Sequence, residues 1–297
     1  MRNPRHIAFG YSTKCNIRCG HCVAAGELSN DVKMEHNRAE AVIEEMACYN
    51  VKGISFTAGE PILFFKNICK LIRICEKNNI YSRIVTNGYW AKTRETSDRI
   101  VLELKQSGLS QLRISSSRWH QENVDKNNFV NAAASCKKYD LDYFISFVTD
   151  FSEQDDKLEQ FLQDMKLKYF PEPVIYSGRA EGFKRSTILT DFQPNTCTMN
   201  PYLSPELDMF ACCDAGKRFE KTDFLYLGNL KDYSIGELLY SHIRNMGITN
   251  IASYLGFKAS EIVKCRKCEL CEKLFNSVDN LSVLKEAADS DLMTWSR

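Results

Sequence analysis

The chain has 297 residues, of which 44% are hydrophobic and 26% are charged, and its formal net charge is +1 at pH 7. These values are ordinary for a globular protein, and so small a net charge gives no overall electrostatic reason to expect nucleic acid or an anionic membrane as a partner. No segment is long and apolar enough to cross a bilayer, and the N-terminal residues lack the apolar core of a secretory signal, so we expect a cytoplasmic protein.

Strand-like and helix-like segments alternate through the first two thirds of the chain. Runs rich in Ile, Val, Phe and Tyr predict strands at residues 5–11, 53–57, 81–86, 111–115, 142–149 and 173–176. Between them, residues 36–49, 64–77 and 97–106 repeat apolar side chains at helical spacing. This alternation predicts an α/β fold with a parallel sheet, and six units suit a partial (β/α)6 TIM-like barrel.

The alternation stops after about residue 189. Residues 191–223 are rich in Pro, Asn and Cys, a helix-like stretch follows at 235–257, and a polar, helix-like tail closes the chain. We therefore predict two domains, a partial barrel at residues 1–190 and a small Cys-rich domain at residues 191–297.

Nine of the thirteen cysteines fall into tight groups, which in a reducing compartment favours metal or cluster ligands over disulfides. The first group, Cys15-x3-Cys19-x2-Cys22, follows the first predicted strand. A structural zinc site or a ferredoxin cluster takes four protein ligands, whereas three thiolates suit a 4Fe–4S cluster with one open iron. We expect His21 to pack near this site rather than to ligate metal, because adjacent residues rarely converge on one ion.

Small or polar residues follow several of the predicted strands. Ala58-Gly59-Glu60 follows the second strand, Asn87 the third and Arg179 the sixth, while Ser115 ends the fourth. Taken singly, these residues are also explained as turn and cap residues or, for Arg179, as an exposed loop residue. Because the carboxyl ends of parallel strands meet at one edge of the sheet, we expect these small or polar residues to surround the cysteine triad.

Together these motifs resemble the radical S-adenosylmethionine (SAM) superfamily, whose signature the segment Cys-Asn-Ile-Arg-Cys-Gly-His-Cys matches. The resemblance implies that Cys15, Cys19 and Cys22 hold a 4Fe–4S cluster to which SAM binds. It implies a 5′-deoxyadenosyl radical that abstracts a substrate hydrogen, and an electron donor such as flavodoxin or ferredoxin. It further implies SAM contacts at Ala58, Gly59, Glu60, Asn87, Ser115 and Arg179, with Ala58 in place of a usual glycine and Arg179 alternatively a substrate contact.

The later cysteines suggest a second site. Cys197, either Cys212 or Cys213, and Cys268 with Cys271 offer four thiolates for an auxiliary 4Fe–4S cluster or, alternatively, for zinc. This region resembles the Cys-rich auxiliary domains of SPASM or twitch type. Cys265 is an extra cysteine that replaces Cys268 or Cys271 as a ligand or has no role.

A narrower resemblance concerns the segments Thr86-Asn87-Gly88-Tyr89-Trp90, Met209-Phe210-Ala211-Cys212-Cys213 and Cys271-Glu272-Lys273-Leu274-Phe275-Asn276-Ser277. They are similar to the radical SAM peptide epimerases of the YydG type, isomerases that convert L-residues of a ribosomally synthesised peptide to D-residues. The similarity implies that Cys212 holds the auxiliary cluster and that Cys213 donates a hydrogen atom. Alternatively, Cys213 is a ligand or has no catalytic part.

Three other functions remain open. One is a radical SAM maturase that forms thioether or carbon–carbon crosslinks, which needs no thiol donor. Another is an epimerase or dehydrogenase of a sugar-like natural-product intermediate. The third is a non-catalytic regulator that binds Fe–S or zinc, although such a regulator needs no ammonium-binding Glu60. No leader-peptide-binding domain is apparent ahead of the first strand, so we expect recognition through the barrel mouth, the second domain or another protein.

Overall fold

The computed structural model describes residues 6–185, 197, 199–214, 225–239, 247–265 and 267–289. These residues divide into two compact units. The barrel unit comprises residues 6–185 with 203–206, and the C-terminal unit comprises the described residues of 197–202 and 207–289. The predicted domain boundary at residues 190 and 191 lies outside the described residues and stays a prediction.

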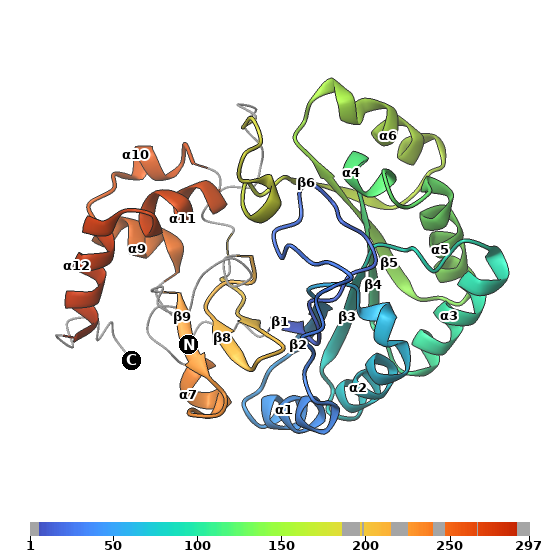
Figure 1. The fold of residues 1–297 in the computed structure, drawn as a ribbon, viewed down its shortest axis with the longest axis horizontal. Helices are drawn as coiled ribbons and strands as arrows, with labels where there is room; N and C mark the ends of the chain where they lie inside the picture. Colours follow the sequence, from blue (N-terminus) through green and yellow to red (C-terminus); the bar gives the residue numbers. More distant parts are fainter. Residues whose placement is uncertain are drawn as a thin grey trace. The chain divides into compact units, whose positions relative to one another are not determined.

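A parallel sheet of six strands forms the centre of the barrel unit (Figure 1). The strands pair in chain order: β1 (His6–Gly10), β2 (Gly53–Thr57), β3 (Tyr81–Thr86), β4 (Gln111–Ser116), β5 (Asp142–Thr149) and β6 (Tyr169–Pro173). The predicted α/β fold with a six-stranded parallel sheet is therefore confirmed.

Five helices follow the strands and cover the outer face of the sheet (Figure 1): α1 (His36–Cys48), α2 (Phe65–Lys77), α3 (Arg94–Gln106), α5 (Lys126–Lys138) and α6 (Glu153–Asp164). The barrel unit also contains the short helices η1 (Pro61–Phe64), α4 (Arg118–Gln121) and η2 (Gly178–Ala180). Ile54, Ile84 and Leu112 are fully buried on the helix-covered face. Because side chains alternate along a strand, their neighbours Arg83 and Arg113 lie on the opposite face, called the concave face below.

The sixth strand begins earlier than the sequence predicts. β6 is Tyr169–Pro173 rather than residues 173–176, and it contains prolines at positions 171 and 173. Ile145 N–H donates to the Lys168 carbonyl and Val174 N–H donates to the Thr149 carbonyl at 2.9 Å each, so the even-numbered residues direct their backbone toward β5. Pro171 and Pro173 therefore stand where a backbone N–H would face away from the sheet, and neither removes a bond to β5.

The C-terminal unit contains a short antiparallel pair and a group of helices. Strands β8 (Asp208–Phe210) and β9 (Tyr226–Asn229) pair with each other, and β7 (Tyr202–Leu203) precedes them in the chain. The helices are α7 (Ile235–Leu239), α9 (Ile248–Tyr254), α10 (Ala259–Ile262), α11 (Lys267–Phe275) and α12 (Val278–Asp289). A core that includes Ile251, Leu270 and Leu274 lies among these elements.

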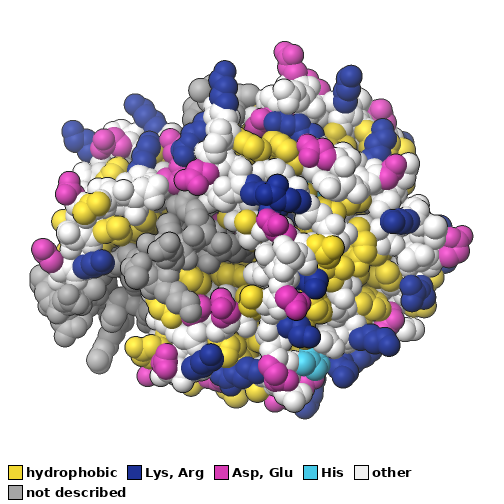
Figure 2. Space-filling model, viewed as in Figure 1, with side chains coloured by type: hydrophobic (Ala, Val, Ile, Leu, Met, Phe, Trp, Pro, Cys, Tyr) yellow, Lys and Arg dark blue, Asp and Glu magenta, His cyan; other side chains and the backbone are white. Residues whose placement is uncertain are grey.

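On the face drawn in Figure 2, Lys and Arg side chains alternate with Asp and Glu, so the described residues there form no extended patch of one charge. This mixture agrees with a formal net charge of +1. Within the described ranges, every helix is too short or too polar to cross a membrane.

Candidate active site

The loop that carries the cysteine triad is folded against itself. Ser12 Oγ donates to the Val32 carbonyl at 2.7 Å, and Cys15 N–H donates to the Glu27 carbonyl at 3.0 Å. Cys22 N–H donates to the carbonyl of Cys19 at 3.2 Å. These bonds bring the three cysteines into one small region after β1.

The three thiols lie within electrostatic reach of one another. Burial raises the pKa of Cys15 to about 11, and nearby Glu60 and Cys22 add to the rise. Burial raises the pKa of Cys19 further, again with contributions from Cys22 and Cys15. Three neighbouring thiolates would repel one another unless they shared a cation, so this thiol set fits an iron–sulfur cluster.

The segment after β2 runs close against the cysteine loop. Ala58 and Gly59 have φ angles of +63° and +61°, and Glu60 N–H donates to the Lys14 carbonyl at 2.8 Å. A Cβ atom on Gly59 would stand 2.3 Å from the Lys14 carbonyl oxygen. Position 59 therefore requires glycine for space as well as for conformation, whereas Ala58 tolerates a left-handed backbone at modest strain.

The Glu60 carboxylate lies beneath this segment and is only 2% exposed. It accepts hydrogen bonds from the Thr86 hydroxyl at 2.8 Å, from Asn87 N–H at 2.8 Å and from Ile62 N–H at 3.0 Å. Burial outweighs these bonds and raises the pKa of Glu60 to about 7. Glu60 thus joins the ends of β2 and β3 to η1; its expected pairing with the SAM ammonium stays a prediction.

Asn87 and Ser115 lie at the ends of their strands, but only Asn87 has a hydrogen bond to the cysteine loop among the described contacts. Asn87 Nδ2 donates to Asn16 Oδ1 at 3.0 Å and to Cys15 Sγ at 3.9 Å. Ser115 is half-buried and stands opposite Ser146 in the β4–β5 register. Asn87 is therefore placed to orient Cys15, while Ser115 belongs to the concave face.

Arg179, on η2, contacts the cysteine loop directly. Its Nε donates to the carbonyl of Cys19 at 2.9 Å, and its Nη2 donates to the carbonyl of Gly26 at 3.1 Å. The backbone N–H of Arg179 also donates to the Cys22 carbonyl at 3.2 Å. In this structure the guanidinium braces the loop, and its role as a SAM or substrate contact stays a prediction.

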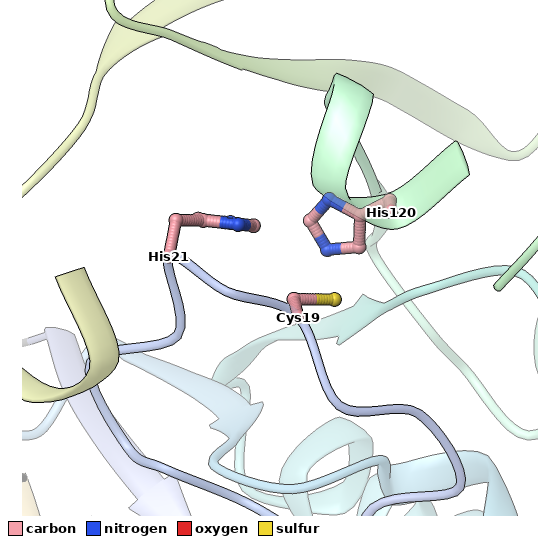
Figure 3. A group of neighbouring side chains, drawn as sticks. All are labelled: Cys19, His21 and His120. Atoms are coloured by element: carbon pink, nitrogen blue, oxygen red, sulfur yellow. The ribbon is translucent and has the colours of Figure 1, made fainter. Parts of the chain in front are cut away.

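His21 and His120 lie next to Cys19 (Figure 3), and their ligand atoms and the Cys19 sulfur all lie within 4.8 Å of one another. The two rings are 4.8 Å apart between centroids, and His21 also packs on Trp119 at 4.9 Å. Burial lowers the pKa of His120 to about 4, so its imidazole is neutral near pH 7. Because Cys19 belongs to the triad, the two imidazole rings lie beside one of the proposed cluster ligands.

Sequence reasoning missed His120, which comes from an element far from the triad in the chain. Ser117 caps α4 by accepting from His120 N–H at 3.1 Å, and its hydroxyl lies 2.8 Å from His120 Nδ1. The signal in the sequence is a serine at the end of a strand with a histidine three residues later, which is typical of a helix N-cap and indicates no particular chemistry.

The later cysteines gather in the C-terminal unit. Cys212 and Cys271 are buried in its core, and Cys197 packs against that core. A hydrogen bond with Cys213 favours the Cys212 thiolate, but burial and nearby Cys271, Asp214 and Cys197 together leave the pKa of Cys212 raised. Cys268 lies on α11 three residues before Cys271. The structure thus brings Cys197, Cys212 and Cys271 together, and the auxiliary ligand set stays a prediction.

Cys213, which is hydrogen-bonded to Cys212, and Cys265 each have a further polar partner. Cys213 is half-buried, and its Sγ donates to Asp214 Oδ2 at 3.5 Å. Cys265 is buried, accepts from Lys273 Nζ at 3.1 Å and donates to the Glu261 carbonyl at 3.4 Å.

Comparison with known proteins identifies two curated relatives of part of the chain. The putative peptide biosynthesis protein YydG of Bacillus subtilis (strain 168) is 22% identical over 179 residues, which are 59% of this chain and 56% of the relative. The GTP 3′,8-cyclase of Clostridium perfringens (strain 13 / Type A) is 28% identical over 123 residues, 38% of this chain and 35% of the relative. The chain thus spans about half of the first relative and about a third of the second.

Two solved structures share the fold. The structure of anSMEcpe with bound AdoMet has a TM-score of 0.60 at 15% identity and covers 97% of this chain and 100% of its own. The structure of BtrN in complex with AdoMet and 2-DOIA has a TM-score of 0.54 at 15% identity, covering 89% of this chain and 93% of its own. The family model described as the radical SAM superfamily matches residues 10–165, more than half of the chain, and includes the whole cysteine triad. The chain therefore belongs to the radical SAM superfamily.

Proposed function

We propose that this chain is a radical SAM enzyme that converts L-residues of a ribosomally synthesised peptide to D-residues, with the Cys213 thiol as hydrogen-atom donor. The observation that carries this proposal is the contrast between two adjacent cysteines. Cys212 is buried beside Cys197 and Cys271, whereas Cys213 is half-buried and donates to Asp214. The similarity to YydG, a putative peptide biosynthesis protein, supports a peptide as substrate.

In this proposal Cys15, Cys19 and Cys22 hold a 4Fe–4S cluster, and the residues around Gly59 and Glu60 bind SAM. When reduced, the bound cluster and SAM supply a carbon radical that removes a hydrogen atom from the substrate. The protein orients the cysteine loop through Arg179 and Asn87 and keeps Cys19 buried and Cys15 and Cys22 partly buried. Cys197, Cys212, Cys268 and Cys271 hold an auxiliary cluster, and flavodoxin or ferredoxin provides electrons.

The proposed inversion balances at the substrate carbon. One Cα–H bond breaks on one face, and the Cys213 S–H bond breaks to form a new Cα–H bond on the other face. A thiol that donates a hydrogen bond still carries the hydrogen atom that this step needs, and the distance of 3.5 Å from Cys213 Sγ to Asp214 Oδ2 is compatible with such a bond. The sulfur left behind takes up one electron and one proton before the next turnover, so the new hydrogen comes from solvent.

The experiment uses anaerobically reconstituted protein with SAM, a strong reductant and, as candidate substrates, the short peptides that sequencing of the neighbouring genes identifies. In D2O, the peptide is expected to gain one deuterium at each inverted residue with no other change in mass. Loss of two hydrogens would indicate crosslinking instead. Absence of 5′-deoxyadenosine from protein with intact clusters would refute an enzyme of this class.

Two neighbouring variants separate the roles of the paired cysteines. Cys213→Ala is expected to form 5′-deoxyadenosine and to keep all its iron, but to yield no inverted residue. Cys212→Ala is expected to lose the iron of the auxiliary cluster. If Cys213→Ala loses that iron as well, Cys213 is a ligand and the donor assignment is wrong.

A further inference from the structure

The concave face of the sheet carries a polar group that the cysteine triad does not use. It consists of Arg113 on β4, Ser146 on β5 and Glu172 on β6, three adjacent strands (Figure 1). Arg113 Nη2 donates to Ser146 Oγ at 2.9 Å and to the Glu172 carboxylate. Ser146 Oγ donates to Glu172 Oε2 at 2.8 Å. We call these three residues the lumen group.

The lumen group is not sealed inside the protein. Ser146 is fully buried, whereas the side chains of Arg113 and Glu172 each keep 25% of their surface exposed. The Nε of Arg113 is buried and has no hydrogen-bond partner among the described residues. A buried donor without a partner destabilises the protein, so a ligand that accepted from Nε would gain binding free energy there. Because Nε has no partner among the described residues, the guanidinium can turn toward a ligand without breaking a hydrogen bond at Nε.

Aromatic rings border the lumen group. Phe144 lies 5.7 Å from the Arg113 guanidinium and 5.6 Å from that of Arg83. Phe170, opposite Ser146 in the β5–β6 register, is 49% exposed. The face therefore combines a hydrogen-bonding centre with apolar surface, as expected for a ligand that has both polar and apolar parts.

The charges of the lumen group select the class of ligand. Arg113 and Glu172 neutralise each other, so an anionic or a cationic ligand must compete with an existing ion pair. A peptide amide is neutral and has one acceptor and one donor, which match the guanidinium and the carboxylate respectively. The pair thus favours a backbone amide over a free carboxylate or amine.

The edge of the sheet favours the same mode of recognition. A peptide that added to β6 as a seventh strand would need outward backbone donors, and Pro171 and Pro173 remove them. Since the edge of β6 lacks these donors, we expect an extended peptide to be bound by side chains of the concave face rather than by the sheet edge.

We propose that Arg113, Ser146 and Glu172 form a subsite that binds a backbone amide of the peptide substrate, with Phe144 and Phe170 beside the substrate side chains. This subsite rests on the proposed function for the identity of the natural substrate. Its chemistry can be tested without turnover, since small amides of defined charge report on it directly.

The probes are N-acetyl-L-phenylalanine N-methylamide, its carboxylate analogue N-acetyl-L-phenylalanine, and its amine analogue L-phenylalanine N-methylamide. Binding of each to the reconstituted full chain is measured by calorimetry. The neutral diamide is expected to bind most tightly, and Glu172→Gln and Arg113→Gln are each expected to weaken it about tenfold, as for a lost hydrogen bond to a charged group. Tighter binding of the carboxylate or the amine analogue would overturn the assignment.

Asp142→Asn is the matched control. It changes a carboxylate to an amide on β5 in the Asp142–Lys168 ion pair, which is exposed and measures 2.7 Å, and it is expected to leave diamide binding unchanged. Ser146→Ala, which removes only the bridging hydroxyl, is the milder variant if a charge change prevents folding. It is expected to weaken the diamide as well, and unchanged binding in a folded Ser146→Ala protein would contradict the proposal.

SAM affinity separates the subsite from the cofactor site. Glu172→Gln and Arg113→Gln are expected to raise the KM for the peptide while the Kd for SAM stays constant. A loss of SAM affinity in either variant would make the lumen group part of the cofactor site and would overturn the proposal. If no peptide is inverted but the diamide results hold, the subsite stands and the epimerase function is wrong. If peptides are inverted but the variants change neither KM nor diamide binding, the subsite is wrong.

Discussion

Arg179 Nε donates a hydrogen bond to the carbonyl oxygen of Cys19 at 2.9 Å, joining residues that are 160 positions apart in the chain. The same guanidinium donates to Gly26, and its Nη1 lies 3.7 Å from Glu27. Its side chain is only 13% exposed, so these bonds are largely shielded from water. The position of Cys19 therefore depends on a residue beyond the last strand of the barrel.

Replacing Arg179 is expected to loosen the cysteine loop. Arg179→Ala removes two hydrogen bonds from a charged donor, and we expect a loss of about 2 kcal/mol in unfolding free energy together with less iron per chain. Arg179→Lys keeps the charge but not the fork between two carbonyls, so it is expected to be intermediate. Arg99→Ala, at an exposed position of α3, is the control and should change neither value. Full iron content with weaker SAM binding in Arg179→Ala would instead identify Arg179 as a cofactor contact.

Gly59 is expected to tolerate no side chain. In Gly59→Ala the new Cβ would stand 2.3 Å from the Lys14 carbonyl oxygen at a φ of +61°. Strain in the left-handed region and the backbone clash together are expected to lower the unfolding free energy by at least about 2 kcal/mol and to reduce bound iron. Gly182→Ala is the matched control, because a Cβ at that position has no neighbour within 4 Å. Wild-type stability and iron content in Gly59→Ala would contradict the close approach of the two loops.

The sheet could be predicted from the sequence where strands alternate buried and half-buried residues. β3 and β4 show this alternation along their whole length, and their bounds agree closely with the prediction. The sequence predicts the last strand four residues too late, at 173–176, because Pro171 lies inside the observed β6 and proline is unusual within a strand. Pro171 and Pro173 are tolerated because the backbone at these two positions faces away from β5. The direction of each backbone group of β6 is known only from its pairing with β5.

The site could be predicted only where spacing along the chain carries the chemistry. The triad is such a case, since its three cysteines lie within eight residues. The contacts of Arg179 with the triad loop and of His120 with Cys19 join distant segments. The resemblance indicated Arg179 as a site residue but not its bonds to the loop, and His120 has no distinctive local pattern. For Glu60 the sequence indicated a charge but not its three donors, which come from the end of β3 and from a short helix.

Glu60 is expected to make stability depend on pH. Burial raises its pKa to about 7 in the folded protein, above an ordinary value of 4.5. The folded state therefore holds this proton more firmly than the unfolded state, and stability is expected to fall as pH rises from 4.5 through about 7 and then to level off. Relative to Glu60→Gln, which does not titrate, the wild type should lose up to about 3 kcal/mol between pH 5 and pH 8.

Urea unfolding of both proteins across this pH range measures the difference. Glu153→Gln, at an exposed position of α6, is the control, and its profile should follow that of the wild type. If the SAM ammonium pairs with Glu60 as proposed, saturating SAM should favour the charged carboxylate and flatten the dependence. A wild-type profile parallel to that of Glu60→Gln would show that folding does not change the pKa of Glu60, and would contradict the raised pKa.

Cys265 and Cys271 are both buried cysteines of the C-terminal unit, but only Cys271 is expected to hold iron. The Cys265 sulfur already accepts from Lys273 Nζ at 3.1 Å and donates to the Glu261 carbonyl at 3.4 Å. The hydrogen bond with Cys265 is the largest cause of the raised pKa of Lys273, so the amine stays an ammonium, which would repel a metal ion at the same sulfur. Cys271 instead lies near Cys212 in the core, with Cys197 packed against it.

Cys265→Ser is therefore expected to retain the iron of the auxiliary cluster, whereas Cys271→Ser is expected to lose it. Iron and sulfide per chain after anaerobic reconstitution, with the EPR signal of the reduced protein, measure the loss. Both variants replace a buried sulfur with oxygen, so each controls for the packing change caused by the other. Equal loss of iron would place Cys265 among the ligands. Retention of iron in both variants would show that neither Cys265 nor Cys271 is required for the auxiliary cluster. The assignment of Cys271 as a ligand would then be wrong.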